Sequence, residues 1–366
     1  MKRLKVLHAI PDYQIAGAGK YLLTLVAQPE YSCQVESVVC CPEGPLAARL
    51  RDLGVQWLPL PGRDKSFSPR AVAAMVGVIE KVRPHLVHTH ASLSARIAAW
   101  LCRVPVVFTK HTPDRSRARV LGVLQGLLSR GAIAVSQHVA QVLQDQGYPA
   151  HKIQVIYNGV DPNQFSQDKG CNGMAAGAPG AVIGTVGRLV PQKGHSVLVR
   201  AAKTVVERFP DCRFLIAGEG PERQNLMALV RQLGLEGWVS FRGYVEDVPS
   251  FLRKLDLFVL PSLEEGLGIA LVEAMMCGLP VVASRGGGIP EVIRDPSIGI
   301  LVEPNDPDGL AQAMVKVLEH RQESLEMGAR ARQFALEHFN AAHMAQRTVE
   351  FYLKVMGEGR RSDCQG

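Results

Sequence analysis

Short apolar runs rich in β-branched residues alternate with longer stretches in which apolar residues recur at helical spacing. In the N-terminal half, this alternation predicts buried parallel strands and amphipathic helices in β-α order. The predicted strands are Leu4–Ala9, Val35–Cys40, Leu86–His88, Val104–Thr109, Ala132–Val135 and Ile153–Tyr157. The predicted helices are Tyr21–Ala27, Pro45–Leu53, Pro69–Val82, Leu93–Cys102 and Gln137–Gln146. Elements in this order fold as a doubly wound parallel sheet.

The alternation stops at Gln167–Gly180, which lacks periodicity and is rich in Gly and Ala, as is typical of an interdomain linker. It then restarts. The strands predicted there are Val182–Val186, Arg213–Ala217, Val239–Phe241, Leu257–Leu260, Val281–Ala283 and Ile300–Val302. The helices predicted there are His195–Glu207, Pro221–Leu233, Ile269–Met276 and Pro307–Glu319, and Leu325–Met356 also has helical spacing.

The pattern therefore predicts an α/β fold with two Rossmann-like, doubly wound domains. The N-terminal domain covers residues 1–170 and the C-terminal domain covers 171–340; a C-terminal helix over 341–358 and a disordered tail over 359–366 follow. A chain of 366 residues is long enough for each domain to bury a core of its own.

The net charge of +7 is unevenly distributed along the chain. Residues 1–170 hold 20 Lys and Arg against 11 Asp and Glu, whereas the remainder holds 21 against 23. This excess of +9 predicts an anionic partner for the N-terminal half: nucleic acid, a phosphorylated substrate or an anionic membrane. Nucleic acid is the least favoured of the three, because no zinc finger or RNA-binding aromatic pattern accompanies the charge.

The chain carries no segment that reads as a signal peptide or a membrane span. The apolar stretch Val6–Ile10 near the N-terminus is interrupted by His8 and is too short for a secretory core region, and no run of 18 uncharged apolar residues occurs. The eight cysteines are scattered without C-x-x-C or zinc-ligand spacing. We therefore expect a soluble, cytoplasmic protein with buried structural thiols.

The first candidate phosphate loop is Ala16-Gly17-Ala18-Gly19-Lys20, between the first strand and the first helix. Glycines there let phosphate approach backbone N–H groups at a helix N-terminus. The loop is neither a P-loop, since Gln14 stands at the leading Gly position, nor a dinucleotide fingerprint, since Leu22 stands at the third. A dehydrogenase is thereby disfavoured, and an ordinary turn remains an alternative.

Two further motifs follow strands of the second domain. Gly187–His195 places Arg188 and Lys193 around a Gly/Pro turn, and these two cations suit a diphosphate unless the turn is merely solvated. Leu263–Ala274 opens a helix with Gly266 and Gly268, and Glu273 lies in its otherwise apolar part. That carboxylate needs a partner, either sugar hydroxyls or a buried cation. A third segment of this domain, the Gly-rich Ser284–Glu291 after another strand end, allows close approach of a ligand or another chain segment.

His88-Thr89-His90 ends one predicted strand and His111 ends another. No carboxylate ladder or H-E-x-x-H accompanies them, so the sequence predicts no metal site. A polar contact from His111 to a sugar or acceptor fits better.

These motifs together resemble the retaining glycosyltransferases of family 4, which have the GT-B fold. The resemblance rests on Glu265-x7-Glu273 with the following A-x-x-x-G-x-P-V-V-A, on GRLVPQKG and RGGGIPEV, on the early Gly-x-Gly and on Asn158–Asp161. It extends over nearly the whole chain in the family's order. Leu267 stands where family members usually carry Phe, and Ala16 replaces the first Gly of their usual Gly-Gly start.

The resemblance implies a role for each matching residue. Arg188 and Lys193, with Gly187 beside them, bind the donor diphosphate; Glu273 binds the ribose; and Glu265 binds the donor sugar. The catalytic set it implies is His111, Arg188, Lys193 and Glu265, and the further donor contacts are Gly17, Gly19, Gly266, Leu267 and Gly268. Gly243, Tyr244 and Val245 are candidate nucleobase contacts. The resemblance also implies a donor site in the cleft between the domains and a C-terminal helix that returns to the N-terminal domain.

The same resemblance implies retention at the anomeric carbon and no metal or other cofactor, with a UDP- or GDP-sugar as substrate. The acceptor is expected to be a lipid-linked or cell-envelope glycan. Two alternatives share the fold: a non-hydrolysing sugar-nucleotide epimerase and a non-catalytic nucleotide-sugar-binding relative.

Asp114–Arg130 combines four arginines with six Val and Leu residues. A cationic, Leu-rich helix of this kind can lie in a membrane interface, or it can pack its apolar side into the domain. The charge of the N-terminal half favours the first alternative, and we expect a peripheral protein at an anionic membrane surface.

Overall fold

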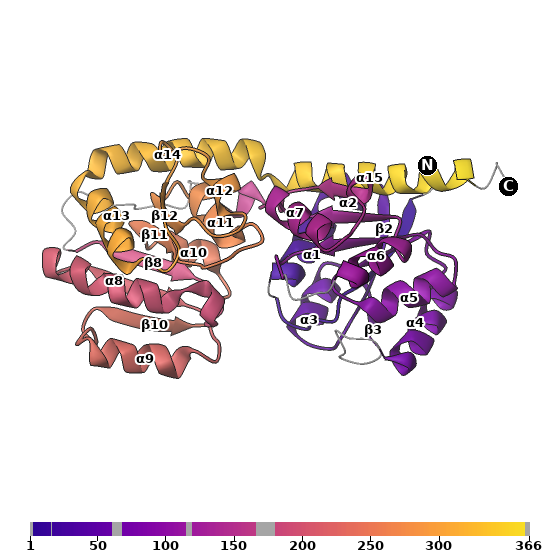
Figure 1. Ribbon diagram of the computed structural model, residues 1–366, viewed down its shortest axis with the longest axis horizontal. Coiled ribbons are helices and arrows are strands. Elements are labelled where there is room, and N and C mark those ends of the chain that lie inside the picture. Colours follow the sequence, from indigo (N-terminus) through magenta and orange to yellow (C-terminus); the bar gives the residue numbers. More distant parts are fainter. Residues whose placement is uncertain (1–2, 16, 61–67, 115–118, 166–179, 363–366) are drawn as a thin grey trace. The chain divides into compact units, whose positions relative to one another are not determined.

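The computed structural model describes residues 3–15, 17–60, 68–114, 119–165 and 180–362, without the side chains of 119–121 and 358–362. The chain divides into two compact units (Figure 1). Unit 1 comprises residues 1–159 and 341–366, and unit 2 comprises Val160–Asn340. Residues 160–165 therefore belong to unit 2, although the sequence places the boundary at 170. Most of the predicted linker, 167–180, lies outside the described residues.

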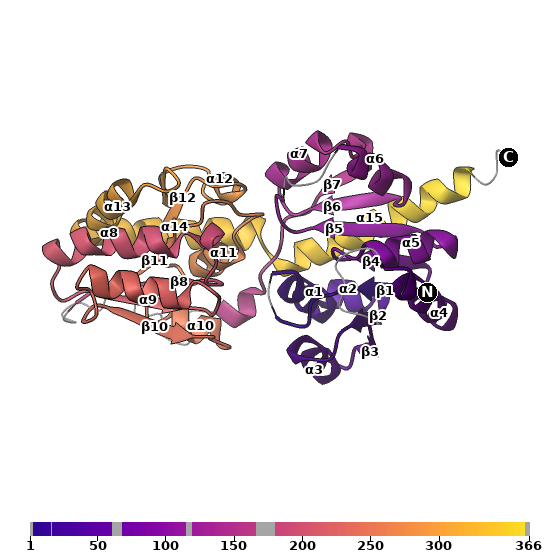
Figure 2. The ribbon, with the colours of Figure 1, turned by 60° about the horizontal axis from the view of Figure 1, so that its bottom comes forward.

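Unit 1 is built on a seven-stranded, wholly parallel sheet in the order β3-β2-β1-β4-β5-β6-β7 (Figure 2). The strands are β1 (Leu4–Ala9), β2 (Val35–Cys41), β3 (Gln56–Pro59), β4 (Leu86–Thr89), β5 (Val106–Lys110), β6 (Gly131–Ala134) and β7 (Ile153–Val155). The half-exposed edge strand β3 was not predicted, because four residues with few apolar positions give no periodic signal.

The helices of unit 1 follow the strands in alternation. They are α1 (Gly17–Ala27), α2 (Pro29–Ser32), α3 (Pro45–Asp52), α4 (Pro69–Val82), α5 (Leu93–Leu101), α6 (Arg119–Leu127) and α7 (Gln137–Asp145). Ser68, Ser92 and Ser136 cap α4, α5 and α7, since each hydroxyl accepts a hydrogen bond from the backbone N–H three residues on.

Unit 2 repeats this topology with six parallel strands in the order β10-β9-β8-β11-β12-β13. The strands are β8 (Val182–Val186), β9 (Arg213–Ala217), β10 (Val239–Gly243), β11 (Leu257–Leu260), β12 (Val281–Ser284) and β13 (Ile300–Val302). The helices are α8 (His195–Arg208), α9 (Arg223–Gln232), α10 (Val248–Leu252), α11 (Ile269–Met276), α12 (Ile289–Val292), α13 (Pro307–Glu319) and α14 (Arg321–His338). The prediction of two doubly wound domains is confirmed.

The last helix, α15 (Ala341–Ser362), returns to unit 1 and packs on α1 and α2 (Figure 1). Phe351 and Tyr352 join the same apolar core as Tyr21 and Tyr31. The sequence predicts one helical stretch over Leu325–Met356, but α14 and α15 are separate helices. They separate at residues 339–340, where the backbone N–H of Val160 donates to the carbonyl of Phe339 instead.

The end of the chain corrects one further expectation. The helix continues to Ser362, so residues 359–362 are helical rather than part of a disordered tail. Residues 363–366 lie outside the described part. None of the helices that the structure describes has both the length and the apolar character of a membrane-spanning helix.

Candidate functional site

In unit 2, β8 and β11 are neighbours at the point where the strand order reverses. Ligands of open α/β sheets bind at this switch point, beyond the carboxyl ends of the strands. The loop after β8 carries Arg188 and Lys193, and the loop after β11 carries Glu265. The sheet therefore brings two of the predicted donor-binding motifs to one place.

Lys193 and Glu265 form an ion pair across this switch point. The Nζ atom of Lys193 lies 2.5 Å from Oε1 of Glu265, and the hydroxyl of Ser262 donates to the same oxygen at 2.8 Å. Glu265 is only 9% exposed, so its carboxylate depends on these two donors. Sequence reasoning missed Ser262, whose only signal is its place two residues after the end of β11.

Glycines hold the loops of this site close together. Gly194 has φ +62° and leaves no room for a side chain, because a Cβ there would lie 2.0 Å from the carbonyl oxygen of Pro261. The N–H of Leu263 donates to the carbonyl of Gln192. Gly287 (φ +64°) approaches the backbone of Glu265 in the same way, so the Gly-rich run after β12 packs against another chain segment.

The Glu265 loop leads into α11. Gly266, Leu267 and Gly268 are all buried, and Gly268 begins the helix with φ +93°. Glu273, five residues further on, is 2% exposed. Because the first N–H groups of a helix lack backbone partners, this helix start presents donors and a positive dipole end. A buried carboxylate and a helix N-terminus thus lie on one short element.

Arg188 and His195 lie on either side of Lys193 in the sequence. Arg188 is exposed and has no ionic partner among the described residues, so its guanidinium can reach an anion. His195 is 3% exposed, and burial together with the charge of Lys193 lowers its pKa to about 4. A Cβ on Gly187 would contact its ring, so the neutral imidazole of His195 packs against the backbone of Gly187. Sequence reasoning quoted His195 in the motif but gave it no role.

The predicted nucleobase contacts lie at the end of β10 and directly after it, at the same edge of the sheet. Gly243 accepts a backbone hydrogen bond from Gly218 at 2.7 Å, and Tyr244 is 63% exposed. Val245 is half-buried beside it. An exposed tyrosine ring here provides a surface on which a base can stack.

Unit 1 has its own switch point between β1 and β4. Gly17 and Gly19 follow β1, but they differ in what surrounds them. A Cβ on Gly19 would lie 2.7 Å from the carbonyl oxygen of Gln14, whereas no described residue beyond the local helix backbone lies within 4 Å of a Cβ on Gly17. The fold therefore requires glycine at position 19 and leaves the space above Gly17 open.

Four histidines gather at this edge: His8 on β1, His88 at the end of β4, and His90 and His111 just after β4 and β5. His88 bonds Tyr352 through Nδ1 at 2.5 Å and Thr109 through Nε2 at 2.7 Å. Nε2 of His8 bonds the hydroxyl of Tyr31 at 2.8 Å.

Burial keeps all four rings neutral. It lowers the pKa of His8 and His111 to about 3, and it lowers the pKa of His88 and His90 well below the usual range. One nitrogen from each of His8, His88 and His90 lies within 4.8 Å of the others, a spacing compatible with a metal ion. Both nitrogens of His88 are already hydrogen-bonded, however, so a metal here would have to displace Tyr352 or Thr109.

Nδ1 of His90 lies 3.1 Å from Nε2 of His111, and the two rings stack. Because both rings are neutral, one donates and the other accepts. If His111 donated, the N–H on Nε2 of His90, which is 1% exposed, would have no acceptor. Donation from His90 would leave the N–H on Nδ1 of His111 without an acceptor in the same way, so in either direction one buried N–H lacks a partner among the described residues. Sequence reasoning missed this hydrogen bond between His90 and His111.

Two families match the chain. Residues 176–334 match the glycosyl transferases group 1, and residues 15–164 match glycosyltransferase family 4. D-inositol 3-phosphate glycosyltransferase of Corynebacterium urealyticum is 30% identical, over 80% of this chain and 78% of its own length. The UDP-Gal:alpha-D-GlcNAc-diphosphoundecaprenol alpha-1,3-galactosyltransferase of Escherichia coli is 29% identical, over 87% of this chain and 89% of its own length.

Among solved structures, HepE of Anabaena in complex with UDP and glucose matches with a TM-score of 0.85 at 24% identity, covering 96% of this chain and 100% of HepE. Sucrose-phosphate synthase of Thermosynechococcus elongatus matches with a TM-score of 0.81 at 19% identity, covering 98% and 100%. These likenesses confirm the fold. The named relatives transfer sugars, which favours glycosyl transfer over the epimerase alternative. With two family matches, a relative at 30% identity and two Rossmann-like sheets, the chain belongs to glycosyltransferase family 4, the retaining enzymes with the GT-B fold.

Proposed function

We propose that this glycosyltransferase moves a sugar from a UDP- or GDP-sugar to a lipid-linked, cell-envelope glycan acceptor, with retention at the anomeric carbon. The Lys193–Glu265 pair at the switch point of unit 2 is the observation that carries the proposal. Lys193 has three N–H donors and Glu265 takes one of them, which leaves donors for phosphate oxygens.

In the proposed mechanism, Lys193 and Arg188 neutralise the diphosphate as the bond to the sugar breaks. Preorganised charge of this kind stabilises a leaving group without reorganisation during the reaction. Glu265, held by Ser262 and Lys193, accepts hydrogen bonds from hydroxyls of the donor sugar, and Glu273 does so from the ribose. The start of α11 offers backbone N–H groups. His111 contacts the donor sugar as a neutral hydrogen-bonding group rather than as a base.

We further propose that these cations replace a metal ion at the diphosphate. Activity should then persist in excess EDTA. Loss of activity in EDTA that manganese or magnesium restores would contradict this part of the proposal.

The choice of base rests on relatives. The Escherichia coli relative is named for UDP-Gal, and a Mycolicibacterium smegmatis mannosyltransferase, 32% identical over 55% of this chain, is named as GDP-mannose-dependent. Both names also include a lipid: diphosphoundecaprenol in the first and phosphatidylinositol in the second.

The surface of unit 1 supports a peripheral membrane location. The apolar side chains Val123, Leu124 and Leu127 of α6 are 52%, 49% and 70% exposed, which an ordinary packed helix would not leave in solvent. Arg115 and Arg117, which belong to the same predicted membrane segment, lie outside the described residues. An anionic membrane fits this combination of exposed apolar side chains and positive charge.

The test is a panel of UDP, GDP, ADP and their sugars in a thermal-shift assay, followed by product analysis without acceptor. A ligand that binds the folded state raises Tm by mass action. We expect UDP or GDP and one of its sugars to raise Tm, with no epimerised sugar among the products. The absence of any shift, or accumulation of an epimer, would exclude the proposed activity.

A further inference from the structure

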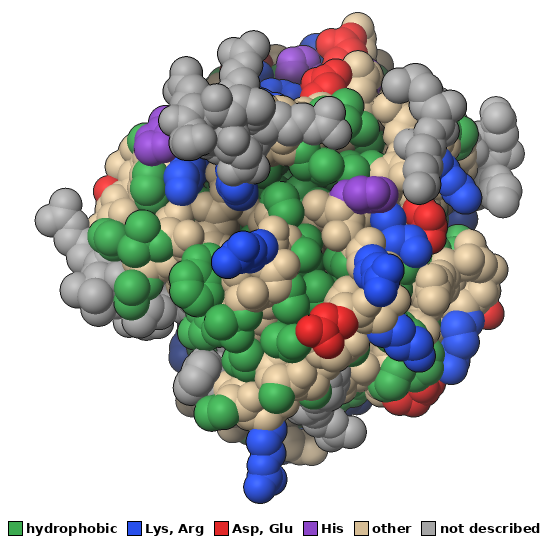
Figure 3. Space-filling view, turned by 90° about the vertical axis from the view of Figure 1, so that its right-hand side faces the viewer, with side chains coloured by type: hydrophobic (Ala, Val, Ile, Leu, Met, Phe, Trp, Pro, Cys, Tyr) green, Lys and Arg blue, Asp and Glu red, His purple; other side chains and the backbone are tan. Residues whose placement is uncertain are grey.

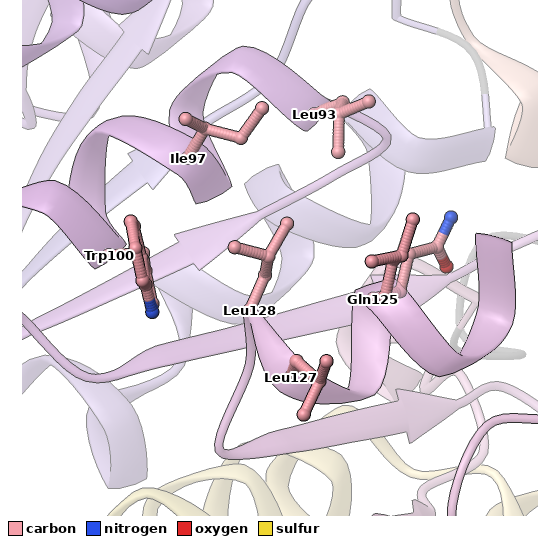
Figure 4. Close-up of a pocket in the computed structure, with 7 residues that line it drawn as sticks. Leu93, Ile97, Trp100, Gln125, Leu127 and Leu128 are labelled. Carbon is pink, nitrogen blue, oxygen red and sulfur yellow. The ribbon is translucent and has the colours of Figure 1, made fainter. Parts of the chain in front are cut away.

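A groove lies between α5 and α6 of unit 1 (Figure 4). None of the strand-end residues described above is in its lining. Its volume is about 360 Å³, at the lower end of the range for small-molecule sites. Its lining is almost entirely carbon and comprises Leu93, Ile97, Trp100, Leu124, Gln125, Leu127 and Leu128.

The rim of the groove is unusually apolar for a protein surface. Trp100, Leu124 and Leu127 line it and are 57%, 49% and 70% exposed, and Leu101 and Val123 beside it are 55% and 52% exposed. These five form half of the large hydrophobic residues that are exposed in the described part of the chain. Figure 3 shows the end of unit 1 that carries α4 and α5, where hydrophobic side chains gather with Lys and Arg near them.

The groove starts at the edge of the sheet that carries the histidines. The first residue of α5, Leu93, follows His90 by three positions and lines the groove. Trp100 lies seven residues further along α5, or about 10 Å away at 1.5 Å per residue. In Figure 4, Leu93 and Trp100 lie at opposite ends of the groove. A ligand with its polar end at the strand-end edge can therefore extend an apolar part along the groove.

The charge of the surrounding segment indicates that the polar group of such a ligand is anionic. Residues 93–130 contain seven Lys and Arg and a single acid, Asp114. Among the described ones, Lys110 ends β5 at the strand-end edge, where Leu93 begins the groove, whereas the exposed Arg103 and Arg130 follow the C-terminal ends of α5 and α6 at its other end. An apolar groove within a basic segment complements a molecule with a hydrocarbon chain and an anionic group.

Two other occupants fit less well. A peptide would bring backbone N–H and C=O groups into a groove whose lining offers only Gln125 and the indole N–H of Trp100 as polar groups, and most of these backbone groups would lose their hydrogen bonds to water. A second copy of the chain would need an interface of about 20 to 30 residues a side, far more than the seven that line the groove.

We propose that the groove between α5 and α6 holds the hydrocarbon chain of the phosphate-bearing lipid to which the acceptor glycan is attached. The inference rests on the proposed function only in taking the acceptor to be lipid-linked. It assigns the chain to a defined groove rather than to general insertion of unit 1 into a membrane.

The test measures binding of farnesyl phosphate, below its micellar concentration, to the full chain by calorimetry. Dimethylallyl phosphate, with the same headgroup and a much shorter chain, is the ligand control. W100S/L127S alters two exposed groove residues, and L101S/V123S alters two equally exposed residues outside the groove. Because all four side chains are exposed, both variants should fold. I97F, which fills the groove without removing exposed apolar surface, is a second test.

We expect farnesyl phosphate to bind at least tenfold more tightly than dimethylallyl phosphate. W100S/L127S and I97F should each weaken farnesyl phosphate at least tenfold, whereas L101S/V123S should stay within twofold of wild type. Equal losses in the two double variants, or no advantage of the longer chain, would overturn the proposal in favour of a general membrane surface. Thermal shifts with UDP and GDP, measured on the same proteins, report separately on the donor site, so failure of the proposed function is distinguishable.

Discussion

The ammonium group of Lys193 lies 2.5 Å from the carboxylate of Glu265, although 72 positions separate the two residues in the sequence. They meet because β8 and β11 are adjacent in the sheet, although α8, β9, α9, β10 and α10 lie between them in the sequence. Each is therefore the other's counter-ion before any donor is bound.

Removing either charge should affect both stability and catalysis. Lys193→Ala leaves the carboxylate of Glu265 with Ser262 as its remaining described donor, so we expect a lower Tm and a kcat/KM reduced at least a hundredfold, equivalent to about 2.7 kcal/mol. Adding Glu265→Gln to Lys193→Ala should recover part of Tm but not of kcat/KM. Lys203→Ala, an exposed cation on α8, is the control. Activity near that of wild type in Lys193→Ala would refute the donor-binding assignment.

Glu273→Gln tests the second carboxylate with nearly unchanged shape. If Glu273 holds the ribose hydroxyls, the variant should lower kcat/KM about a hundredfold and abolish most of the Tm shift that the nucleotide diphosphate produces. The control Glu236→Gln, at an exposed acid of unit 2 outside the motifs, should leave both measurements unchanged. A purely structural role for Glu273 predicts instead a loss of Tm with an unchanged shift on adding nucleotide.

Substitutions of Gly17 and Gly19 by Ala should have different effects, the first on donor binding and the second on stability. A methyl group on Gly19 would meet the backbone of Gln14, so Gly19→Ala should destabilise unit 1 by about 1–3 kcal/mol. The space above Gly17 is open, so Gly17→Ala should keep the wild-type Tm and weaken donor binding if a phosphate approaches this backbone. Denaturant unfolding and donor titration measure the two effects. Unchanged donor affinity in Gly17→Ala would remove Gly17 from the site.

The sequence predicted most elements of the fold but only some of the residues at the strand ends that form the candidate site. Apolar runs such as Leu257–Leu260 and the run around Ile269–Met276 predicted their elements well, because the strand is buried throughout and the helix from Leu271 onward. Residues of the Lys193 and Glu265 loops were predicted from motifs. The sequence did not predict the roles of Ser262, His195 and the His90–His111 pair. These roles depend on which strands become neighbours in the sheet, and a single polar residue at a strand end forms no recognisable motif.

The buried histidines should make the protein sensitive to acid. Burial lowers the pKa of His8 and His111 to about 3 and that of His195 to about 4, whereas an unfolded histidine titrates near 6.5. Between these values the unfolded chain binds more protons than the folded chain. The histidines' contribution to the free energy of unfolding is therefore complete above about pH 6.5 and falls as the pH decreases below it. Each such histidine contributes a slope of up to about 1.4 kcal/mol per pH unit.

We therefore expect the unfolding midpoint to drop steeply between pH 6.5 and pH 5, before most carboxylates titrate. His8→Gln should reduce the slope by about one proton, while His343→Gln, at an exposed position of α15, should leave it unchanged. Midpoints by circular dichroism across this range give the slopes. A midpoint independent of pH over this window would show that the histidines are not buried in the neutral form.

Substitution of His90 tests whether it positions His111. His90→Phe removes the hydrogen bond to Nε2 of His111, and we expect kcat to fall about tenfold, as for the loss of one hydrogen bond worth about 1.4 kcal/mol. His90→Asn places an amide, which can donate or accept, near the former Nδ1 and should recover kcat to within about threefold of wild type. Both variants lose the packed imidazole, so both should lower Tm to a similar extent. The positioning role therefore predicts different kcat values at similar stability, whereas a purely structural role predicts that kcat follows Tm in both.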